Sequence, residues 1–359
     1  MTIFYVLLAI LLLGILVTVH EFGHFIAARL TGIEVVEFAI GFGPKLLGWK
    51  SKKYDTQFSL RLIPMGGYCA FYGEDDAEGK TDDDPRAYNK QSVWKRMLTV
   101  ISGPGMNFVL AFVVLFIFLL FSGVVDVKPD SLYIDSTDPH SAAEAAGIQR
   151  GDIILSINGD AVERDLAAES LRSAVDRHAR PNEPLHIELL RGEEIIPVEL
   201  IPTYDETQNR YLLGVLLTYE LTDPRTPTLG EALQLSWRNC VNAGSTILVA
   251  LKNLVTTGEG LEETGGPVGI IHAVTTQTQQ GGIDAYLNLM IVLSINLGIM
   301  NLLPIPGLDG SRILFNIVEA VRRKPIPAQK EAMIHLAGYA LLIGLMIFFT
   351  FKDVARLFQ

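Results

Sequence analysis

Four long apolar stretches constrain the fold of this 359-residue chain more than any other feature. Their approximate ranges are Ile3 to Leu30, Met97 to Phe121, Ala285 to Leu303 and Met333 to Phe351. A helix of about 20 apolar residues crosses the hydrocarbon core of a bilayer, and each stretch is close to or beyond that length. Because lipid offers no hydrogen bonds to the backbone, the sequence predicts a multi-pass α-helical membrane protein with about four transmembrane helices.

Basic residues indicate how these helices are oriented. The connection between the first two contains Lys45, Lys50, Lys52, Lys53, Arg61, Lys90, Lys95 and Arg96, and the connection between the last two contains Arg312, Arg322, Arg323 and Lys324. Cytoplasmic connections carry an excess of Lys and Arg. We therefore expect both connections on the cytoplasmic side, and both termini and residues 123–282 on the outer side.

Charge and cysteine content exclude several other kinds of protein. The net charge of −11 argues against a nucleic-acid partner, which would need a basic face. The acidic stretch Asp75 to Asp84 is interpreted as a solvated loop. Cys69 and Cys240 are predicted to lie on opposite sides of the membrane, so we expect no disulfide between them. The first apolar stretch lacks basic residues before it and a cleavage site after it, so it is interpreted as a retained helix.

The segment 123–222 is predicted to form a soluble domain of mixed α and β structure. Strand-like runs occur at Ser131 to Asp135, Asp152 to Asn158, Leu185 to Leu190 and Ile195 to Leu200. Asn158-Gly159 is a strong hairpin-turn signal, and Ser141 to Gly147 is typical of a short helix that ends at glycine.

An amphipathic helix is predicted at residues 227–258, with Leu233, Trp237, Cys240 and Val241 on one face. We expect it to pack on the membrane surface or on the soluble domain. The predicted organisation has four parts: a membrane core with the first two helices at 1–122, the soluble domain at 123–222, the amphipathic helix and a connector at 223–282, and the rest of the membrane core at 283–359.

His20-Glu21-Phe22-Gly23-His24 fits the zinc-binding pattern His-Glu-x-x-His. Residues four apart share one face of a helix, so both imidazoles can bind one zinc ion that keeps a position for water. Glu21 can then act as general base and later as proton donor to the leaving amine. Ionisable groups at membrane depth are costly and mark function, although a helix end at the interface would also explain them.

Asp309 is the best candidate for a third ligand. It ends the segment Asn301 to Asp309, in which Pro304, Pro306 and Gly307 must break the third helix. Irregular backbone at membrane depth occurs only where protein or a water-filled cavity surrounds it, which indicates a polar site. Asp309 is also well placed to cap a following helix at Ser311 to Val321, and the two roles are compatible.

Together these residues resemble the site-2 protease family of intramembrane zinc metalloproteases, in particular its bacterial regulators of envelope-stress signalling. His20 to His24 fits the family's zinc motif, and Asn301 to Gly310 fits its motif Asn-x-x-Pro-x-x-x-Leu-Asp-Gly. The resemblance covers essentially the whole chain. It implies a bound Zn²⁺ with Asp309 as third ligand, and Asn301 as a residue that holds the substrate backbone.

The same resemblance implies a substrate class and a location. The expected substrates are single-pass membrane proteins, such as anti-sigma factors or signal-peptide remnants, cleaved in regulated intramembrane proteolysis. The expected location is the bacterial cytoplasmic membrane, with the active site toward the cytoplasmic side and the soluble domain outside. The alternative is a non-catalytic adaptor that gathers envelope proteins through its soluble domain.

Gly41 to Pro44 and Ile63 to Tyr68 are similar to the family's membrane-associated β-region. We interpret Tyr54 to Phe71 as a strand pair with a glycine kink, that is, a membrane-associated β-hairpin. An exposed edge at Met65, Gly66 and Gly67 could bind an extended substrate by β-addition, or the hairpin could be structural only.

Three further features complete the predictions. The run Ala146 to Ile154 resembles part of a single PDZ domain, for which the resemblance allows either peptide binding or size filtering of substrates. Small residues in Ser102 to Asn107 are expected to permit close helix packing, and Asn107 could also face the active site. His272 and His335 are expected to be packed or interfacial rather than metal ligands.

Overall fold

The computed structural model describes residues 2–74, 84–139, 141–163, 167–205, 210–258, 260 and 265–357. The chain divides into two compact units. One unit combines Met1–Phe121 with Thr228–Gln359, and the other is Ser122–Pro227. The predicted acidic loop Asp75 to Asp84 lies, except for Asp84, outside the described residues.

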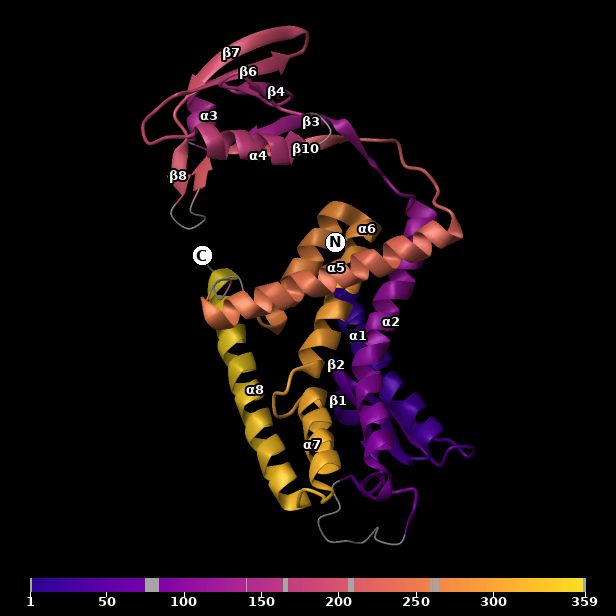
Figure 1. Cartoon of the computed structure of the whole chain (residues 1–359). Helices are drawn as coiled ribbons and strands as arrows, with labels where there is room; N and C mark the ends of the chain where they lie inside the picture. Colours follow the sequence, from indigo (N-terminus) through magenta and orange to yellow (C-terminus); the bar gives the residue numbers. More distant parts are fainter. Residues whose placement is uncertain are drawn as a thin grey trace. The chain divides into compact units, whose positions relative to one another are not determined.

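In the part of the chain that the structure describes, four helices of the first unit are long and apolar enough to cross a membrane. They are α1 (Thr2–Thr31), α2 (Val93–Ser122), α6 (Pro267–Leu302) and α8 (Ala328–Leu357) (Figure 1). Each contains one of the four apolar stretches, so the prediction of a multi-pass helical membrane protein is confirmed.

Helix α6 is longer than the apolar stretch that predicted it. The sequence predicts a helix from Ala285, whereas the structure begins it at Pro267 and kinks it at Gly282, where φ is 63°. The turns before the kink contain buried polar residues, Thr275 and Thr278, so they do not stand out as an apolar run. Residues 267–282 are therefore helical rather than a connector.

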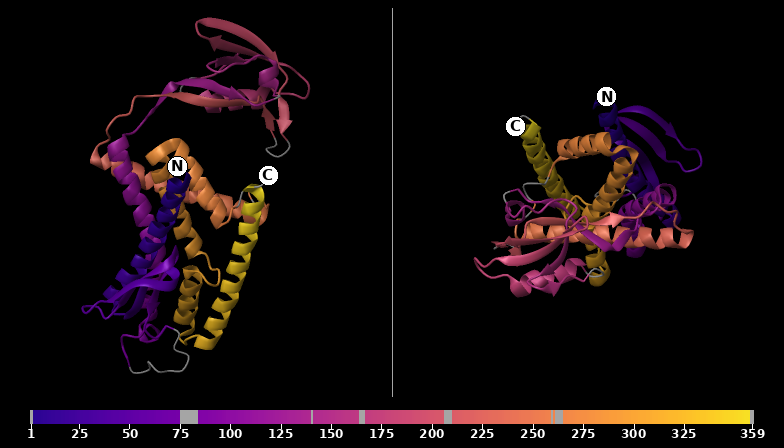
Figure 2. Two further views of the ribbon diagram at one scale, coloured as in Figure 1. Left: turned by 180° about the vertical axis from the view of Figure 1, so that it is seen from behind. Right: turned by 90° about the horizontal axis from the view of Figure 1, so that it is seen from above.

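Helix α6 is central to the packing of the membrane unit. Ala9, Leu12 and Leu16 of α1 cluster with Val274, Tyr286 and Met290 of α6. Ala111 and Leu115 of α2 cluster with Ile291, Ile295 and Ile299 on another face of α6. Because α6 contacts both α1 and α2, residues on these three helices can form one site (Figures 1 and 2).

The predicted amphipathic helix is α5 (Leu229–Thr256). Its N-cap is Thr228, whose hydroxyl accepts a hydrogen bond from the Glu231 backbone N–H. Of the predicted apolar face, Cys240 packs against the cluster of α2 and α6, together with Ala243, Ile247 and Leu251. Leu233, Trp237 and Val241 are exposed instead. Helix α5 therefore joins the membrane unit through the face that contains Cys240.

Strands β1 (Val35–Lys50) and β2 (Gln57–Phe71) form the sheet of the membrane unit. The predicted strand pair within Tyr54 to Phe71 is therefore wrong, because this segment is mostly one bent strand that pairs with residues before it. Glu37 lies opposite both Ala70 and Gln57, so the start of β1 has a paired segment on each side. Gly66, with φ of 109°, permits the bend in β2 that allows this double pairing.

An apolar cluster fixes this sheet to the helices. It contains Phe25 and Ala28 of α1, Ile33, Val35 and Phe38 of the β1 region, Phe71 of β2, Tyr88 of the short 3-10 helix η1 (Tyr88–Lys90), and Val100 of α2. Burial of an aromatic side chain of this size is worth about 1.5–3 kcal/mol, so the sheet is firmly held beside the His-Glu-x-x-His helix.

Within its described residues, the second unit contains two short helices and several strand ladders, and the predicted strands follow one another in the predicted order. Its elements are β3 (Val127–Thr137), α3 (Ala142–Ala145), β4 (Ile153–Ile157), β5 (Asp160–Ala161), α4 (Ala167–His178), β6 (Leu185–Arg191), β7 (Glu194–Leu200), β8 (Thr203–Asp205), β9 (Arg210–Leu212) and β10 (Val215–Leu221). The sheets have the orders β5-β4-β6-β7, β10-β3 and β8-β9. Their inner faces share one core with α3 and α4, which includes Ile134, Ile157, Leu171, Leu185, Ile187 and Leu189.

Two local signals of this unit are confirmed. Asn158 and Gly159 have φ of 49° and 85° and connect β4 to β5 as a two-residue turn, the geometry that favours Asn-Gly. Ser141 caps α3 by accepting a hydrogen bond from the Glu144 N–H, and Gly147 follows the helix with φ of 73°.

Asp152 and Arg191 form a buried ion pair in the second unit. The carboxylate is fully buried and accepts two hydrogen bonds of 2.7 Å from Arg191 and one of 2.9 Å from the Gln149 N–H. Burial opposes the charge of Asp152, but these hydrogen bonds outweigh it and hold the pKa of Asp152 below its usual value. Arg191 is about one-third exposed.

We expect Asp152→Asn to lower the free energy of unfolding of this unit by roughly 2–3 kcal/mol at neutral pH, because it leaves Arg191 without its partner. A carboxyl whose folded pKa is lowered stabilises the fold above about pH 4 and loses that effect as pH falls through the folded pKa. The difference between wild type and variant, measured by urea-dependent proteolysis, should therefore shrink below about pH 4.

Asp135→Asn is the matched control. Its partner Arg150 is 76% exposed, so this pair contributes about 0–1 kcal/mol. Equal destabilisation by the two variants would contradict a special role for the Asp152 pair.

Candidate metal centre

Helix α1 carries both predicted metal-binding histidines on one side. His20 and His24 are 7% and 6% exposed, and their Nε2 atoms lie 3.2 Å apart. One helical turn separates the two residues, so their rings leave the helix in similar directions. Two nitrogen atoms thus converge on one buried position.

The third group comes from the break after α6. The helix ends at Leu302, and Pro304, Pro306 and a positive φ of 95° at Gly307 turn the chain away from the helix axis. The next helix, α7 (Asp309–Arg322), begins at Asp309 itself. The predicted break in the third membrane helix is therefore present.

Asp309 lies beside both histidines. Its Oδ2 atom is 3.0 Å from His20 Nε2 and 3.3 Å from His24 Nε2. The N-cap of α7 is Leu308, and no side chain caps the helix, so Asp309 is not the N-cap that the sequence allowed. The carboxylate is directed at the imidazoles, and the three groups form a set that could hold a metal ion.

Hydrogen bonding shows why these three atoms call for a cation. His24 Nδ1 lies 2.9 Å from the Thr99 carbonyl oxygen, which can only accept, so in the neutral ring Nε2 presents a lone pair. The buried Asp309 Oδ2 has no hydrogen-bond donor among the described residues unless a histidine is protonated. Electron pairs that face one another at 3.0–3.3 Å repel unless a positive charge lies between them.

The spacing of the atoms fits zinc. Tetrahedral zinc with ligands at about 2.0–2.1 Å has adjacent ligand atoms about 3.3 Å apart. The observed separations of 3.0, 3.2 and 3.3 Å lie close to that value. Two imidazoles and one carboxylate also match a common donor set of catalytic zinc sites, in which the fourth position is open.

Helix α2 orients both imidazoles through their other nitrogen atoms. Thr99 supplies its carbonyl oxygen to His24, and the Asn107 side-chain amide lies 3.1 Å from His20 Nδ1. An amide orientation with Oδ1 toward His20 would let it accept the Nδ1 proton, and Oδ1 has no other partner in the described chain. Ser294 of α6 donates a hydrogen bond to the Asn107 carbonyl oxygen.

Two glycines allow α1 and α2 to approach closely at this point. A Cβ atom on Gly23 would lie 2.1 Å from the Ser102 carbonyl oxygen. A Cβ atom on Gly103 would lie 2.2 Å from His24 Nε2. Gly103 therefore keeps the space next to His24 Nε2, a predicted metal ligand, free, which is more specific than the close helix packing expected from the sequence.

Glu21 of α1 lies next to strand β2. A Cβ atom on Gly67 would lie 3.3 Å from Glu21 Cγ, 3.4 Å from Val17 Cγ1 and 2.8 Å from the Ala39 carbonyl oxygen. The structure therefore brings Gly67 to the His-Glu-x-x-His helix, next to the predicted general base. Met65 and Gly66 precede it in the same strand.

Asn301 lies in the last turn of α6 and is half-buried. It precedes the break that leads to Asp309, and its side chain forms no hydrogen bond within the described chain.

Helix α8 supports the loop that carries Asp309. The Gly307 N–H donates a hydrogen bond of 3.3 Å to His335 Nδ1, and a Cβ atom on Gly338 would lie 2.1 Å from the Pro306 carbonyl oxygen. His335 is 8% exposed and packs edge-on against Phe315 of α7. It is packed, as predicted, but it also satisfies a backbone donor in the broken segment.

The contributions of Thr99, Gly103 and His335 were not identified from the sequence. Thr99 acts through its backbone, so its residue type gives no signal. The cluster of glycines around Pro104 indicated close packing, but not the histidine against which Gly103 packs.

We predict that Gly103→Ala lowers zinc affinity by at least about tenfold, because the new methyl group would displace His24. Gly105→Ala is the matched control, since a Cβ atom there meets nothing within 4 Å. Zinc per protein, measured across a chelator series, checks the prediction. Equal zinc retention by both variants would show that the space beside His24 is not critical.

Gly338→Ala should also weaken zinc binding, by about tenfold, because it pushes the Asp309 loop away from α8. Gly344→Ala lies on the same helix and meets nothing within 4 Å, so it should bind zinc like the wild type. Both substitutions favour the helix to the same degree, by about 0.5–1 kcal/mol, which isolates the effect of the contact. Normal affinity in Gly338→Ala would rule out support of the loop by α8.

Comparison with known proteins agrees with this centre. Residues 8–345 match the family model described as Peptidase family M50. A Clostridium perfringens protein named as a zinc metalloprotease is 35% identical over 351 residues, which cover 98% of each chain. A similarly named protein of Clostridium acetobutylicum is 36% identical over 356 residues, covering 99% of this chain and 98% of its own.

The regulator of sigma-W protease RasP from Bacillus subtilis is 32% identical over 426 residues, covering 97% of this chain and 98% of its own. Similarity at this level over nearly the whole length includes the four membrane helices and both segments that form the centre. The chain therefore belongs to peptidase family M50, the site-2 proteases, and is a membrane-embedded zinc metalloprotease.

Proposed function

We propose that this protein is an endopeptidase that cleaves the transmembrane segments of single-pass membrane proteins. His20, His24 and Asp309 are proposed to hold the zinc ion, and Glu21 to act as general base. The observation that carries the proposal is the convergence of three buried acceptor atoms at separations of 3.0–3.3 Å. Two of them belong to α1, and the third belongs to the first residue of α7, after the break that follows α6.

The proposed mechanism gives each side chain a separate task. Zinc in such a site supplies activation of water near neutral pH and polarisation of the scissile carbonyl. Glu21 follows His20 directly on α1 and is not needed as a ligand, so its carboxylate is free to take a proton from the attacking water. It can return that proton to the leaving amine as the peptide bond breaks. Thr99 and Asn107 hold the two imidazoles in orientation throughout.

Substrate is proposed to bind as an added strand along β2. Strand addition fixes a peptide through backbone hydrogen bonds and suits any side chain, as a protease with several substrates requires. The position of Gly67 against Glu21 supports this role for Met65, Gly66 and Gly67. The unused amide of Asn301, close in sequence to the Asp309 loop, is proposed to hold the substrate backbone from the other side.

The second unit is proposed to be a PDZ-like domain, with residues 123–222 on the outer side of the membrane. The proposed location is the bacterial cytoplasmic membrane, with the active site and the membrane-associated β1–β2 sheet toward the cytoplasm. The basic connections before α2 and before α8 support this orientation. The similarity to RasP, which is named as a regulator of sigma-W, supports anti-sigma factors as substrates. Signal-peptide remnants as further substrates, and a peptide-binding or size-filtering role for the domain, are proposed from the family resemblance alone.

We expect Glu21→Gln to keep its zinc and to lose cleavage of a reconstituted single-pass reporter by a factor of at least about 10²–10⁴. His20→Ala should lose zinc as well as cleavage. Zinc content and reporter cleavage are measured on the same purified, reconstituted samples. Full cleavage by Glu21→Gln would refute the assignment of the base, and zinc-free wild-type protein that still cleaves would refute the metal centre.

A further inference from the structure

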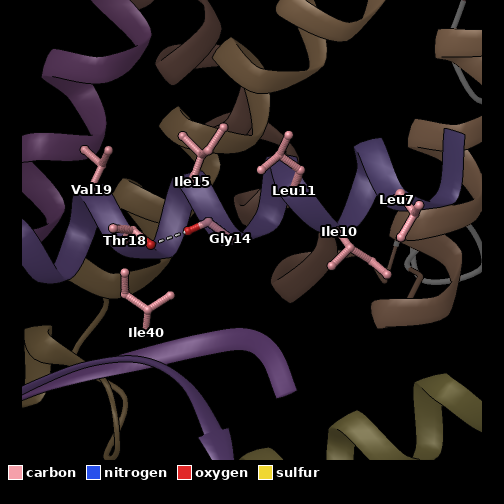
Figure 3. Close-up of a pocket in the computed structure, with 8 residues that line it drawn as sticks. All are labelled: Leu7, Ile10, Leu11, Gly14, Ile15, Thr18, Val19 and Ile40. Atoms are coloured by element: carbon pink, nitrogen blue, oxygen red, sulfur yellow. Dashed lines mark hydrogen bonds between the residues drawn. The ribbon is translucent and has the colours of Figure 1, made fainter. Parts of the chain in front are cut away.

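Helix α1 has an apolar groove on the face that leads to Glu21. The groove has a volume of about 430 Å³ and runs along the helix from Leu7 to Val19, with Ile40 of β1 closing one side. Figure 3 shows Ile40 facing α1 near Thr18, while Leu7 and Leu11 lie farther along the same helix. Leu7 and Leu11 are 59% and 54% exposed, so much of this wall is not covered by any described residue.

The chemistry of the groove fits a second transmembrane helix. Gly14 and Thr18 are four residues apart, the small-x-x-x-small spacing that lets helix backbones approach closely in membranes. The Thr18 hydroxyl donates a hydrogen bond of 2.6 Å to the Gly14 carbonyl oxygen, so it does not present an unpaired donor to lipid. The remaining lining residues are aliphatic.

The groove is continuous with the catalytic region. Gly14 and Glu21 are seven residues apart, so their side-chain directions differ by only about 20° around the helix. Leu7 lies about 21 Å from Glu21 along the axis, which matches most of the length of a membrane-spanning helix. Ile40, at the groove wall, pairs with Gly67, which in turn lies against Glu21.

From these observations we infer that the α1 groove docks the transmembrane helix of the substrate before its end unwinds toward β2. This inference rests on the proposed function, because it names where the substrate of that same centre binds. A helix held at Gly14 and Thr18 has its next turn beside Thr18, Ile40 and Glu21, where it meets the strand edge. A lipid acyl chain would also fill the volume, but the small-residue spacing would not contribute to its binding, because that spacing favours the close approach of two helix backbones. A second copy of this protein would cover the approach to Glu21.

Gly14→Leu tests the groove by filling it. The probes are a single-pass reporter with a leucine-alanine transmembrane helix, chosen because the wild type cleaves it in vesicles, and a short water-soluble fluorogenic peptide with the same cleavage sequence. We expect Gly14→Leu to reduce kcat/KM for the reporter by about tenfold or more and to leave peptide cleavage unchanged, because only the reporter uses docking energy.

Gly344→Leu on α8 is the matched control, since it adds the same side chain at a membrane-helix glycine with open space around it. It should cleave both probes like the wild type. Normal reporter cleavage by Gly14→Leu, or an equal loss for reporter and peptide, would overturn the docking site while leaving the metal centre intact. Loss of both probes in Glu21→Gln, by contrast, reports on the proposed function itself.

Photo-crosslinking identifies the occupant directly. A benzophenone amino acid replaces Leu11 in the Glu21→Gln background, and Leu341 of α8, which is 57% exposed, serves as control. The expected adduct joins Leu11, but not Leu341, to the transmembrane helix of the reporter. Adducts only to lipid, or to a second copy of the protein, would overturn the inference.

Discussion

The repulsion among three buried acceptor atoms is the constraint on which the rest of this structure depends. His20, His24 and Asp309 direct lone pairs at one point, where water is scarce and like partial charges are poorly screened. A cation between these atoms stabilises the arrangement, so zinc binding and the relative positions of α1 and α7 are coupled. The fold serves mainly to hold these atoms at the correct separation.

In the membrane core, small residues and one broken helix bring the three acceptor atoms to these positions. Gly23 and Gly103 let α1 and α2 approach until the Thr99 carbonyl reaches His24. The break after α6 turns a carboxylate inward, at the cost of backbone groups that a helix would have satisfied. His335 of α8 accepts one of them, the Gly307 N–H. Apart from Gly23, these features lie far in sequence from His20 and His24.

The apolar and polar halves of α1 are placed to bind and to cleave the proposed membrane substrate, respectively. One face of the helix provides an aliphatic groove with small residues, and the next turns carry the proposed general base and the two histidines of the candidate metal centre. Strand β2 meets the helix where the two functions join, at Gly67. A substrate helix and an extended substrate strand can thus be bound in succession along one surface, as the proposed chemistry requires.

The local signals in the sequence were sufficient for several predictions. Helical spacing predicts that His20 and His24 share a face, and the prolines of residues 304 and 306 predict the break before Asp309. The Asn158-Gly159 turn follows from the preference of this pair for positive φ. These features depend on residues that are close in sequence, so their geometry is fixed by the chain itself. Roles taken from the family resemblance, such as that of Asn301, remain proposals.

Contacts between distant segments could not be derived in the same way. The sequence did not predict that the start of β1 pairs on both sides with β2, that Gly103 packs on His24, or that His335 supports the Asp309 loop. Residue types alone determined the membrane class, the zinc motif and the broken helix, because these follow from hydropathy, helical periodicity and proline chemistry. Only the tertiary structure decided which backbone atoms, glycines and strand edges surround the metal ligands, because such contacts depend on how separate helices pack together.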